Sequence, residues 1–278
     1  MTDLAELAAV TRETETVRAE PALIRVEGVD KRYAVRQGEP VQALSDIGFE
    51  LRDGEVLSVV GPSGCGKSTL LRIMAGLDAP SRGRVLLGGA PVTGPRREIG
   101  VVFQQATLLP WRTVLDNVLL PAQMQRLDRA RSTGRARDLI ELVGLDGFTD
   151  KYPFELSGGM QQRVAICRAL VCDPRILLMD EPFGALDAMT REQMNVELMR
   201  IQAEQKKTVV FITHSIPEAV FLGDRVMVMT PRPGRVAMLA EIDLPKPRTL
   251  ATMGSAGFAA RCNDIRLAFS GRVGGAEF

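Results

Sequence analysis

The chain has 278 residues, of which 45% are hydrophobic and 25% charged. These proportions exclude an intrinsically disordered chain, and the length suits one large domain or two closely packed ones. The 35 Lys and Arg residues balance 34 Asp and Glu residues, so the net charge is +1. This balance, without a basic cluster, argues against a nucleic-acid partner. The four cysteines form no CxxC pair, which indicates free thiols in a reducing compartment.

The beginning of the chain shows no targeting or membrane-spanning pattern. Along the sequence, no apolar run approaches the roughly 18 residues that a transmembrane helix needs. Asp3 and Glu6 interrupt the start early, unlike the basic and then apolar order of a secretory signal peptide. Residues 1–22 are rich in acids and threonine, which predicts a solvated, flexible leader.

Apolar runs and helical patterns alternate along the rest of the chain. Short apolar runs bounded by punctuating residues predict buried strands, and helical patterns separate several of them. Such alternation is typical of an α/β fold with a mostly parallel sheet. The expected strands are residues 23–29, 41–46, 56–60, 85–87, 99–103, 176–180, 209–213 and 226–230, and the expected helices are residues 67–75, 157–170 and 186–206.

Two segments depart from this alternation. The stretch between Gln104 and Leu156 has few β-branched residues and many helix formers, which predicts a helical insertion beside the sheet. The proline-containing tail after residue 230 is expected to hold a short hairpin and then a weak helix near residues 259–269. The predicted division is a leader at 1–22, a domain at 23–244 with a helical subdomain at about 105–170, and a tail at 245–278.

The strongest local signal joins the strand expected at 56–60 to the helix expected at 67–75. It fits G-x-x-x-x-G-K-[ST], whose glycines let backbone amides surround phosphate oxygens while the helix N-terminus adds a positive dipole. Lys67 is predicted to reach the β- and γ-phosphates, and Ser68 to bind Mg²⁺. A plain glycine-rich turn is the alternative, but it accounts for neither the Lys-Ser pair nor its flanks. The predicted loop comprises Gly61, Pro62, Ser63, Gly64, Cys65, Gly66, Lys67, Ser68 and Thr69.

A second part of the same site is expected at the end of the strand at 176–180. Asp180 follows four apolar residues, so it lies at the carboxyl edge where active sites of open α/β sheets are found. Asp180 is suited to holding Mg²⁺ through water, and Glu181 to orienting the water that attacks a γ-phosphate. Four apolar residues followed by Asp180 and Glu181 would alone indicate only the end of a strand. Together with the phosphate-binding loop, they predict a nucleotide site.

The third signal is the string Leu-Ser-Gly-Gly-Met-Gln-Gln-Arg at residues 156–163. Ser157 is a good N-cap, and Gly158 and Gly159 expose the first amides of the following helix. An ordinary capped helix explains Ser-Gly-Gly alone but not the whole string. Together with the two preceding signals, it resembles the ATP-binding cassette (ABC) ATPase family over roughly residues 23–244.

This resemblance implies a P-loop NTPase core with a mixed, mostly parallel sheet, an antiparallel β part and a helical subdomain. ATP and Mg²⁺ are the implied cofactors. Two cassettes of this family pack head to tail, so a second copy of the chain is the implied partner. The implied catalytic residues are Lys67, Gln104, Glu181 and His214, and the implied metal ligands are Ser68, Gln104 and Asp180. The resemblance also implies that Tyr33 stacks on adenine. The residues implied to contact the nucleotide bound to the other copy are Ser157, Gly158, Gly159 and Gln161.

Alternatives remain for two of these residues. His214 is the single histidine, and a lone histidine is commonly structural, although this one ends an expected strand at the catalytic edge. Tyr33 could instead be a surface residue of an edge strand. Cys65 lies within the loop, where nearby positive charge is expected to lower its pKa and make it reactive; the alternative is a thiol turned into the core.

Three further segments resemble one group of transporters within this family. Residues 109–118, 218–226 and 231–236 look like those of importers for nitrate, sulfonates, taurine and related compounds. The implied function is the ATP-hydrolysing subunit of such an importer, peripheral on the cytoplasmic face of the inner membrane, with an integral permease and, indirectly, a solute-binding protein as partners. Trp111 and Arg112 are expected to face the permease, unless Trp111 packs inside the helical insertion. Ser215 departs from the acidic residue that many importers carry after the histidine.

Two other functions stay open from the sequence. A soluble ABC ATPase of DNA repair or translation shares the motifs, but such proteins usually carry two cassettes or a long coiled-coil insertion. A small-molecule kinase would explain Lys67 but not the string at 156–163.

Overall fold

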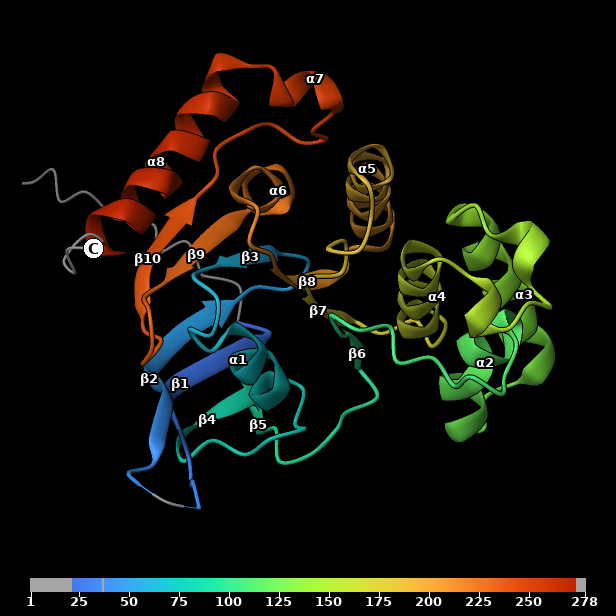
Figure 1. The fold of residues 1–278 in the computed structure, drawn as a ribbon, viewed down its shortest axis with the longest axis horizontal. Coiled ribbons are helices and arrows are strands. Elements are labelled where there is room, and N and C mark those ends of the chain that lie inside the picture. The colour runs from blue at the N-terminus through green and yellow to red at the C-terminus, as the bar shows by residue number, and fades with distance from the viewer. Residues whose placement is uncertain (1–21, 37, 274–278) are drawn as a thin grey trace, which may run out of the picture.

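The computed structural model describes residues 22–36 and 38–273. The leader predicted for residues 1–22 therefore lies, apart from residue 22, outside the described residues. Two sheets and the helices packed around them make up this part of the chain (Figure 1).

A six-stranded sheet forms the centre of the fold. Its order is β10-β9-β3-β8-β7-β6; the strands from β9 to β6 are parallel, and β10 pairs with β9 antiparallel. Strands β3, β7 and β8 are buried along their whole length, as expected for parallel strands covered on both faces. The strands are β3 (Val56–Val60), β6 (Ile99–Val102), β7 (Ile176–Asp180), β8 (Thr208–Ile212), β9 (Arg225–Met229) and β10 (Val236–Glu241).

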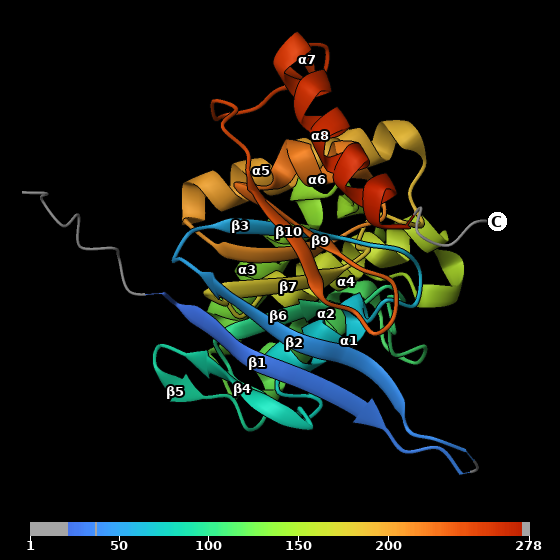
Figure 2. The same cartoon turned by 90° about the vertical axis from the view of Figure 1, so that its left-hand side faces the viewer.

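The second sheet is antiparallel and lies beside the first (Figure 2). Its order is β2-β1-β4-β5, and β1 pairs with both β2 and β4. Helix α1 (Lys67–Met74) shares one hydrophobic core with both sheets through side chains such as Leu71 and Ile73. The strands are β1 (Ile24–Tyr33), β2 (Val41–Leu51), β4 (Arg82–Leu87) and β5 (Ala90–Pro91).

Helices α2, α3 and α4 form a cluster at one end of the molecule. Helices α5 and α6 lie over the face of the central sheet opposite to α1 (Figure 1). Helices α2, α3 and α4 pack against one another in that cluster. Two short 3₁₀ turns, Asp146–Phe148 and Pro153–Glu155, precede α4. The helices are α2 (Val114–Met124), α3 (Arg129–Leu142), α4 (Gly158–Leu170), α5 (Ala188–Gln205) and α6 (Ile216–Leu222).

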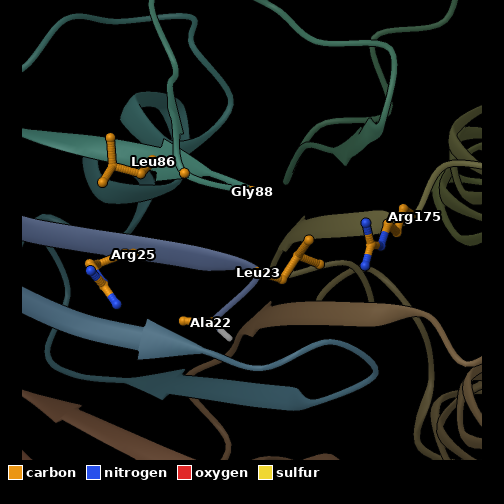
Figure 3. A pocket seen from close by; sticks show the side chains of 7 residues that line it. Ala22, Leu23, Arg25, Leu86, Gly88 and Arg175 are labelled. Atoms are coloured by element: carbon orange, nitrogen blue, oxygen red, sulfur yellow. The ribbon is translucent and has the colours of Figure 1, made fainter. Parts of the chain in front are cut away.

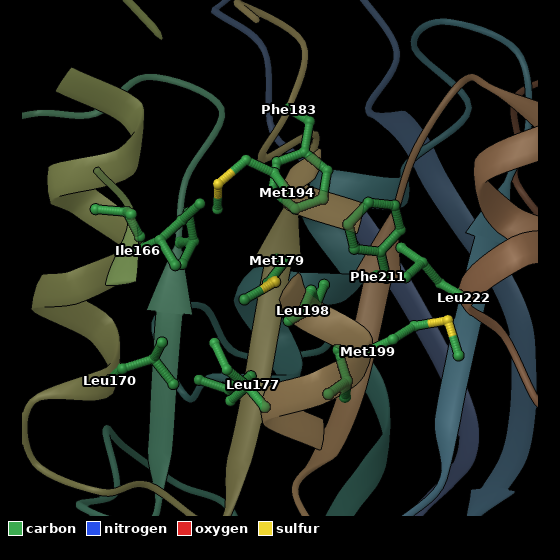
Figure 4. Close-up of a cluster of buried hydrophobic side chains, with 14 of the residues drawn as sticks. Ile166, Leu170, Leu177, Met179, Phe183, Met194, Leu198, Met199, Phe211 and Leu222 are labelled. Atoms are coloured by element: carbon green, nitrogen blue, oxygen red, sulfur yellow. The ribbon is translucent and has the colours of Figure 1, made fainter. Parts of the chain in front are cut away.

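Strand β7 separates two hydrophobic cores. Ile176 and Leu178 join the core of α1 and the antiparallel sheet, whereas Leu177 and Met179 join the core under α4, α5 and α6 (Figure 4). This division follows from the strand, because successive side chains point to opposite faces. The carboxyl end of β7 is thus held rigidly from both sides.

The C-terminal segment packs on the central sheet. Strand β10 returns along β9 as a hairpin, and α7 (Leu250–Met253) leads into α8 (Ala256–Val273). Phe258, Cys262 and Ile265 of α8 are buried in the core that also contains α6. Helix α8 therefore contributes to the same core as the central sheet.

The predicted fold class is confirmed: a mixed, mostly parallel sheet, an antiparallel β part and a helical group. Several boundaries differ from those expected. The strands expected at 23–29 and 41–46 continue to Tyr33 and Leu51, because β1 and β2 stay paired beyond the apolar runs. The weak helix expected near 259–269 is longer at both ends. Among the described residues, no helix combines the length and apolar character needed to cross a membrane.

Candidate functional site

The loop between β3 and α1 has the shape that its glycines predict. Gly64 and Gly66 have φ of 74° and 109°, in the left-handed region that other residues rarely adopt. A Cβ on Gly66 would lie 2.6 Å from Leu44 Cδ2 and 3.0 Å from Ala43 O, so the loop also lies too close to β2 for a side chain there. This cradle of backbone suits a phosphate group.

Lys67 begins α1 and folds back over the loop. Its Nζ donates to Gly61 O at 2.7 Å and to Pro62 O at 3.1 Å, and the residue is buried. These carbonyl partners hold the ammonium group at the loop, where the nucleotide phosphates are expected.

Asp180 ends β7 and lies beside this loop. Burial raises the pKa of its carboxyl above the ordinary value, while a hydrogen bond from the Ser68 hydroxyl and the charge of Lys67 lower it in part. A buried carboxylate paired with a hydroxyl is the hard oxygen donor set that Mg²⁺ prefers. The residues therefore fit this metal.

The carboxylate of Glu181 contacts two other predicted residues. Its Oε2 lies 3.3 Å from Gln104 Nε2 and 3.3 Å from His214 Nδ1. Its φ is +46°, an uncommon conformation for a residue with a side chain, and its N–H donates to Ile212 O of β8 at 2.9 Å. This turned backbone is held at the sheet edge, where the carboxylate meets Gln104 and His214.

Lys67, Ser68, Gln104 and Glu181 line a cavity of about 400 Å³, whereas Asp180 and His214 do not belong to its lining. Tyr33 lies in its wall and is 37% exposed; its hydroxyl donates to Asp78 Oδ2 at 2.9 Å, and Lys31 Nζ lies 4.8 Å from its ring centre. Adenine stacking on this ring stays a prediction. The lining consists of Tyr33, Val41, Ala43, Ser63, Gly64, Gly66, Lys67, Ser68, Thr69, Gln104, Glu181 and Arg232.

Val41, Ala43 and Arg232 were not predicted as site residues. They come from β2 and from the turn between β9 and β10, far in sequence from the phosphate-binding loop. Only the strand pairing and the packing of that turn bring them to the cavity, and the string at 231–236 indicated the importer class without indicating a place in the site.

The string at 156–163 is built as predicted but lies outside this cavity. Ser157 caps α4, its Oγ accepting from Met160 N, and both Ser157 and Gly158 are exposed. Gln161 donates from Nε2 to Pro153 O at 2.9 Å. None of Ser157, Gly158, Gly159 and Gln161 lines the cavity, and their contact with a nucleotide bound to a second copy stays a prediction.

The expectation that Cys65 has a lowered pKa is wrong. Its side chain is 1% exposed and belongs to the core under the loop, and burial raises the pKa of its thiol. The charge of Lys67 lowers that pKa only in part. The backbone of Cys65 stays in the phosphate-binding loop while its sulfur turns inward.

Trp111 lies on the surface beside the N-terminus of α2 and is 69% exposed, so it does not pack inside the helical group. Arg112 donates from Nη1 to Gln123 Oε1 at 2.7 Å. Both residues lie outside the cavity lining, as expected.

Another cavity, of about 390 Å³, lies where β1 and β4 approach the start of β7 (Figure 3). Its two arginines already have partners: Arg25 Nε lies 2.7 Å from Glu50 Oε1, and Arg175 Nη2 lies 2.5 Å from Asp53 Oδ2. It contains no predicted site residue.

Comparisons with known proteins agree with this geometry. The family model described as ABC transporter matches residues 44–184. An uncharacterized ABC transporter ATP-binding protein of Methanocaldococcus jannaschii is 53% identical, covering 81% of this chain and 84% of the relative. The taurine import ATP-binding protein TauB of Rhizobium johnstonii is 49% identical, covering 84% and 88%. The aliphatic sulfonates import ATP-binding protein SsuB of Bacillus cereus is 44% identical, covering 81% and 88%.

Two solved structures show the same fold. A dimeric bacterial ABC transporter cassette is 35% identical with a TM-score of 0.74, covering 80% of this chain and 100% of that chain. A dimeric post-hydrolysis state of an ATP-binding cassette with ADP and Pi is 34% identical, with a TM-score of 0.73 and the same coverage.

Proposed function

Because the chain belongs to the ABC transporter family, we propose that it is the ATP-hydrolysing subunit of an importer that drives uptake of a small solute through a membrane permease. The solute class is nitrate, a sulfonate, taurine or a similar compound, which the similarity to taurine and aliphatic sulfonate import proteins supports. As an ABC ATPase, the chain converts ATP and water to ADP and phosphate.

The observation that carries the catalytic assignment is the meeting of Gln104, Glu181 and His214, of which Gln104 and Glu181 line the phosphate-binding cavity. Glu181 orients and polarises the attacking water, because its carboxylate is partly exposed to the cavity and fixed at the sheet edge. Gln104 and His214 contact that carboxylate and present polar groups to the transferring phosphoryl group. Such transfer needs mainly positioning and electrostatic stabilisation.

In this proposal, Lys67 and the loop amides bind the phosphates, and the ring of Tyr33, which lines the cavity, stacks on adenine. Ser68, Asp180 and Gln104 would hold Mg²⁺, which neutralises phosphate charge when bound. Asp180 is buried and its pKa is raised by that burial, so a nearby cation would favour its charged form.

A complete site requires two copies of the chain. Ser157, Gly158, Gly159 and Gln161 lie outside the cavity of their own copy, and the amides at the start of α4 suit an anion. We expect these residues to close on the nucleotide of the other copy. The dimeric cassettes among the similar structures support this arrangement.

The permease partner places the chain on the cytoplasmic face of the inner membrane as a peripheral subunit. Trp111 is the exposed aromatic residue that we assign to the permease contact, and it follows Gln104 closely along the chain. Nucleotide state and membrane contact can therefore be linked through few residues. A solute-binding protein would act on the permease and not on this chain.

Uptake measurements test the transport function. In a strain lacking the gene, radiolabelled taurine, an alkanesulfonate and nitrate are each offered as solute. We expect the strain to lose uptake of one of these solutes and the wild-type protein to restore it. Glu181→Gln should not restore uptake, although the variant is produced at the same level. If uptake of all three solutes is unchanged while the purified chain hydrolyses ATP, the proposed solute class fails. A chain that purifies with no membrane protein would favour a soluble ABC ATPase instead.

A further inference from the structure

The turn between β9 and β10 is seated between β2 and the phosphate-binding loop. Gly234 donates to Ala43 O at 2.9 Å, and its carbonyl accepts from Ser45 N at 2.9 Å. A Cβ on Gly234 would lie 2.1 Å from Cys65 O, so the turn contacts the loop backbone with no room for a side chain. These contacts fix the turn against the nucleotide site.

The turn also has internal support. Thr230 N donates to Arg235 O at 3.0 Å, and Arg235 N donates to Thr230 Oγ1 at 3.0 Å. Its backbone is therefore tied both across its own base and to β2. A side chain carried by this turn starts from a defined position.

Arg232 is the charged residue that this turn brings to the nucleotide cavity. It lines the cavity together with the phosphate-binding loop, and a Cβ on Gly64 would lie 3.9 Å from its Nη2. Within the part of the chain that the structure describes, its guanidinium makes neither an ion pair nor a side-chain hydrogen bond. Its donors are therefore available to a ligand.

We propose that Arg232 is a further nucleotide-binding residue, whose guanidinium contacts a phosphate group of ATP or ADP in this cavity. This inference rests on the proposed ATP site. A guanidinium has five N–H donors in a planar fork that matches phosphate oxygens, and it keeps its charge at any physiological pH. Lys67 supplies a compact ammonium from inside the loop, and Arg232 supplies a second cation from its rim.

Nucleotide binding by matched variants tests this assignment. Arg232→Ala removes the fork, Arg232→Lys keeps the charge alone, and Arg235→Ala is the control, since Arg235 is an exposed arginine of the same turn outside the cavity lining. Dissociation constants for ATP, ADP and adenosine are measured calorimetrically in EDTA, so that hydrolysis does not alter the ligand. The thermal midpoint without nucleotide checks that each variant is folded.

We expect Arg232→Ala to weaken ATP and ADP binding about tenfold, the loss of one charge-assisted hydrogen bond. Arg232→Lys should lose less, and adenosine binding should not change. Arg235→Ala should bind all three ligands like the wild type. Equal affinities of Arg232→Ala and Arg235→Ala for ATP and ADP would overturn the inference, as would an equal loss for adenosine, which carries no phosphate.

Lys67→Ala separates this inference from the function on which it rests. If Lys67→Ala loses nucleotide while Arg232→Ala keeps it, the ATP site stands and the role of Arg232 fails. If wild-type protein and Lys67→Ala bind ATP equally, the assigned nucleotide site itself fails.

Discussion

At the scale of single residues, Glu181 gives the sharpest test of the chemistry. Glu181→Gln keeps the shape of the side chain but replaces a base by an amide, so we expect ATP binding to persist and turnover to fall at least about 10²-fold. The bound ATP should then hold a dimer together. Sizing chromatography with Mg·ATP and a phosphate-release assay measure both effects. A monomer that hydrolyses ATP at nearly the wild-type rate would contradict the assignment.

The cysteines allow a pH-dependent test at the same scale. Burial raises the pKa of Cys65, Cys172 and Cys262, and that of Cys167 to about 12, so at pH 7.5 each thiol is less ionised than a free one. The reactive species is the thiolate, so alkylation should be slow and should continue to accelerate above the usual thiol pKa.

Peptide mass spectrometry after maleimide treatment measures the order of labelling. Cys172 is the only partly exposed cysteine, the other three being buried, and we expect it to react first. Mg·ATP should not change the rate at Cys65. Fast, ATP-protected labelling of Cys65 would mean that the loop opens far more than its packing indicates.

Local patterns identified most of the residues that do chemistry, because each sits at a fixed offset from a strand end or a helix start. Lys67, Asp180 and Glu181 follow directly from β3, α1 and β7. The direction of a side chain did not follow in the same way: the charge and helix terminus near Cys65 suggested a reactive thiol, but packing turns its sulfur into the core. Arg232 reaches the site only because the β9–β10 turn packs against β2, a contact between distant segments that no short-range pattern encodes.

At the scale of elements, one buried carboxylate connects two loops of the site. Thr213 Oγ1 donates to Glu218 Oε2 at 2.6 Å, immediately before His214. Glu218 Oε1 lies 3.6 Å from Arg191 Nε of α5. Helix α6 therefore holds the histidine loop on one side and reaches α5 on the other.

Arg191 continues this connection to the segment after Glu181. Its Nη2 donates to Leu186 O at 2.9 Å, and its Nε donates to Phe183 O at 3.3 Å. Arg191 of α5 thus binds the carbonyls of Phe183 and Leu186, which flank Gly184 and Ala185, and also pairs with Glu218. A continuous series of side-chain contacts therefore links the loop of His214 to this segment.

Glu218→Ala should therefore lower kcat for ATP roughly tenfold or more, because a small misplacement of catalytic groups is costly. KM for ATP should change little, since the phosphate-binding loop does not touch this link. Glu218→Gln retains the acceptor for Thr213 and should keep more activity. Glu197→Ala is the control, an α5 carboxylate paired only with Arg200 in the described residues. A rise in KM with kcat unchanged would contradict the positioning role.

At the scale of the whole molecule, the architecture followed from alternating strand and helix patterns, whereas the contacts between distant segments did not. The hairpin after residue 230 was expected, yet the sequence alone gave no reason for Arg248 to become 2% exposed. Polar residues in loops usually stay solvated, and only the folded arrangement of α6 and β10 supplies the carbonyls that surround this guanidinium.

The exposed Trp111 belongs to this scale because its partner lies outside the chain. Trp111→Ala should reduce solute uptake by the assembled transporter while basal ATPase of the isolated subunit persists, since the side chain is 69% exposed and outside the cavity. Leu267→Ala, at an exposed position of α8, serves as the control. Loss of basal ATPase in a folded Trp111→Ala protein would place this residue in the catalytic unit instead.

Arg248 attaches the C-terminal segment, which the sequence predicts to be a tail, to the rest of the domain. Arg248 Nη1 donates to Val220 O at 2.8 Å, to Phe221 O at 3.0 Å and to Gly223 O at 2.7 Å, and its Nη2 donates to Ile242 O at 3.1 Å. One buried guanidinium thus satisfies the C-terminal carbonyls of α6 and the end of β10, where a positive charge also favours the helix dipole.

Arg248→Ala leaves those carbonyls buried without a donor, so we expect the free energy of unfolding to fall by at least about 3 kcal/mol. Arg261→Ala is the matched control from α8; its ion pairs with Asp243 and Asp264 are exposed and screened by solvent, so the variant should keep nearly wild-type stability. Urea unfolding followed by circular dichroism and by Trp111 fluorescence measures both. If α8 is part of the cooperative unit, both probes report the same decrease in the free energy of unfolding for Arg248→Ala. A variant that keeps wild-type stability would show instead that residues 245–273 pack on a domain that is complete without them.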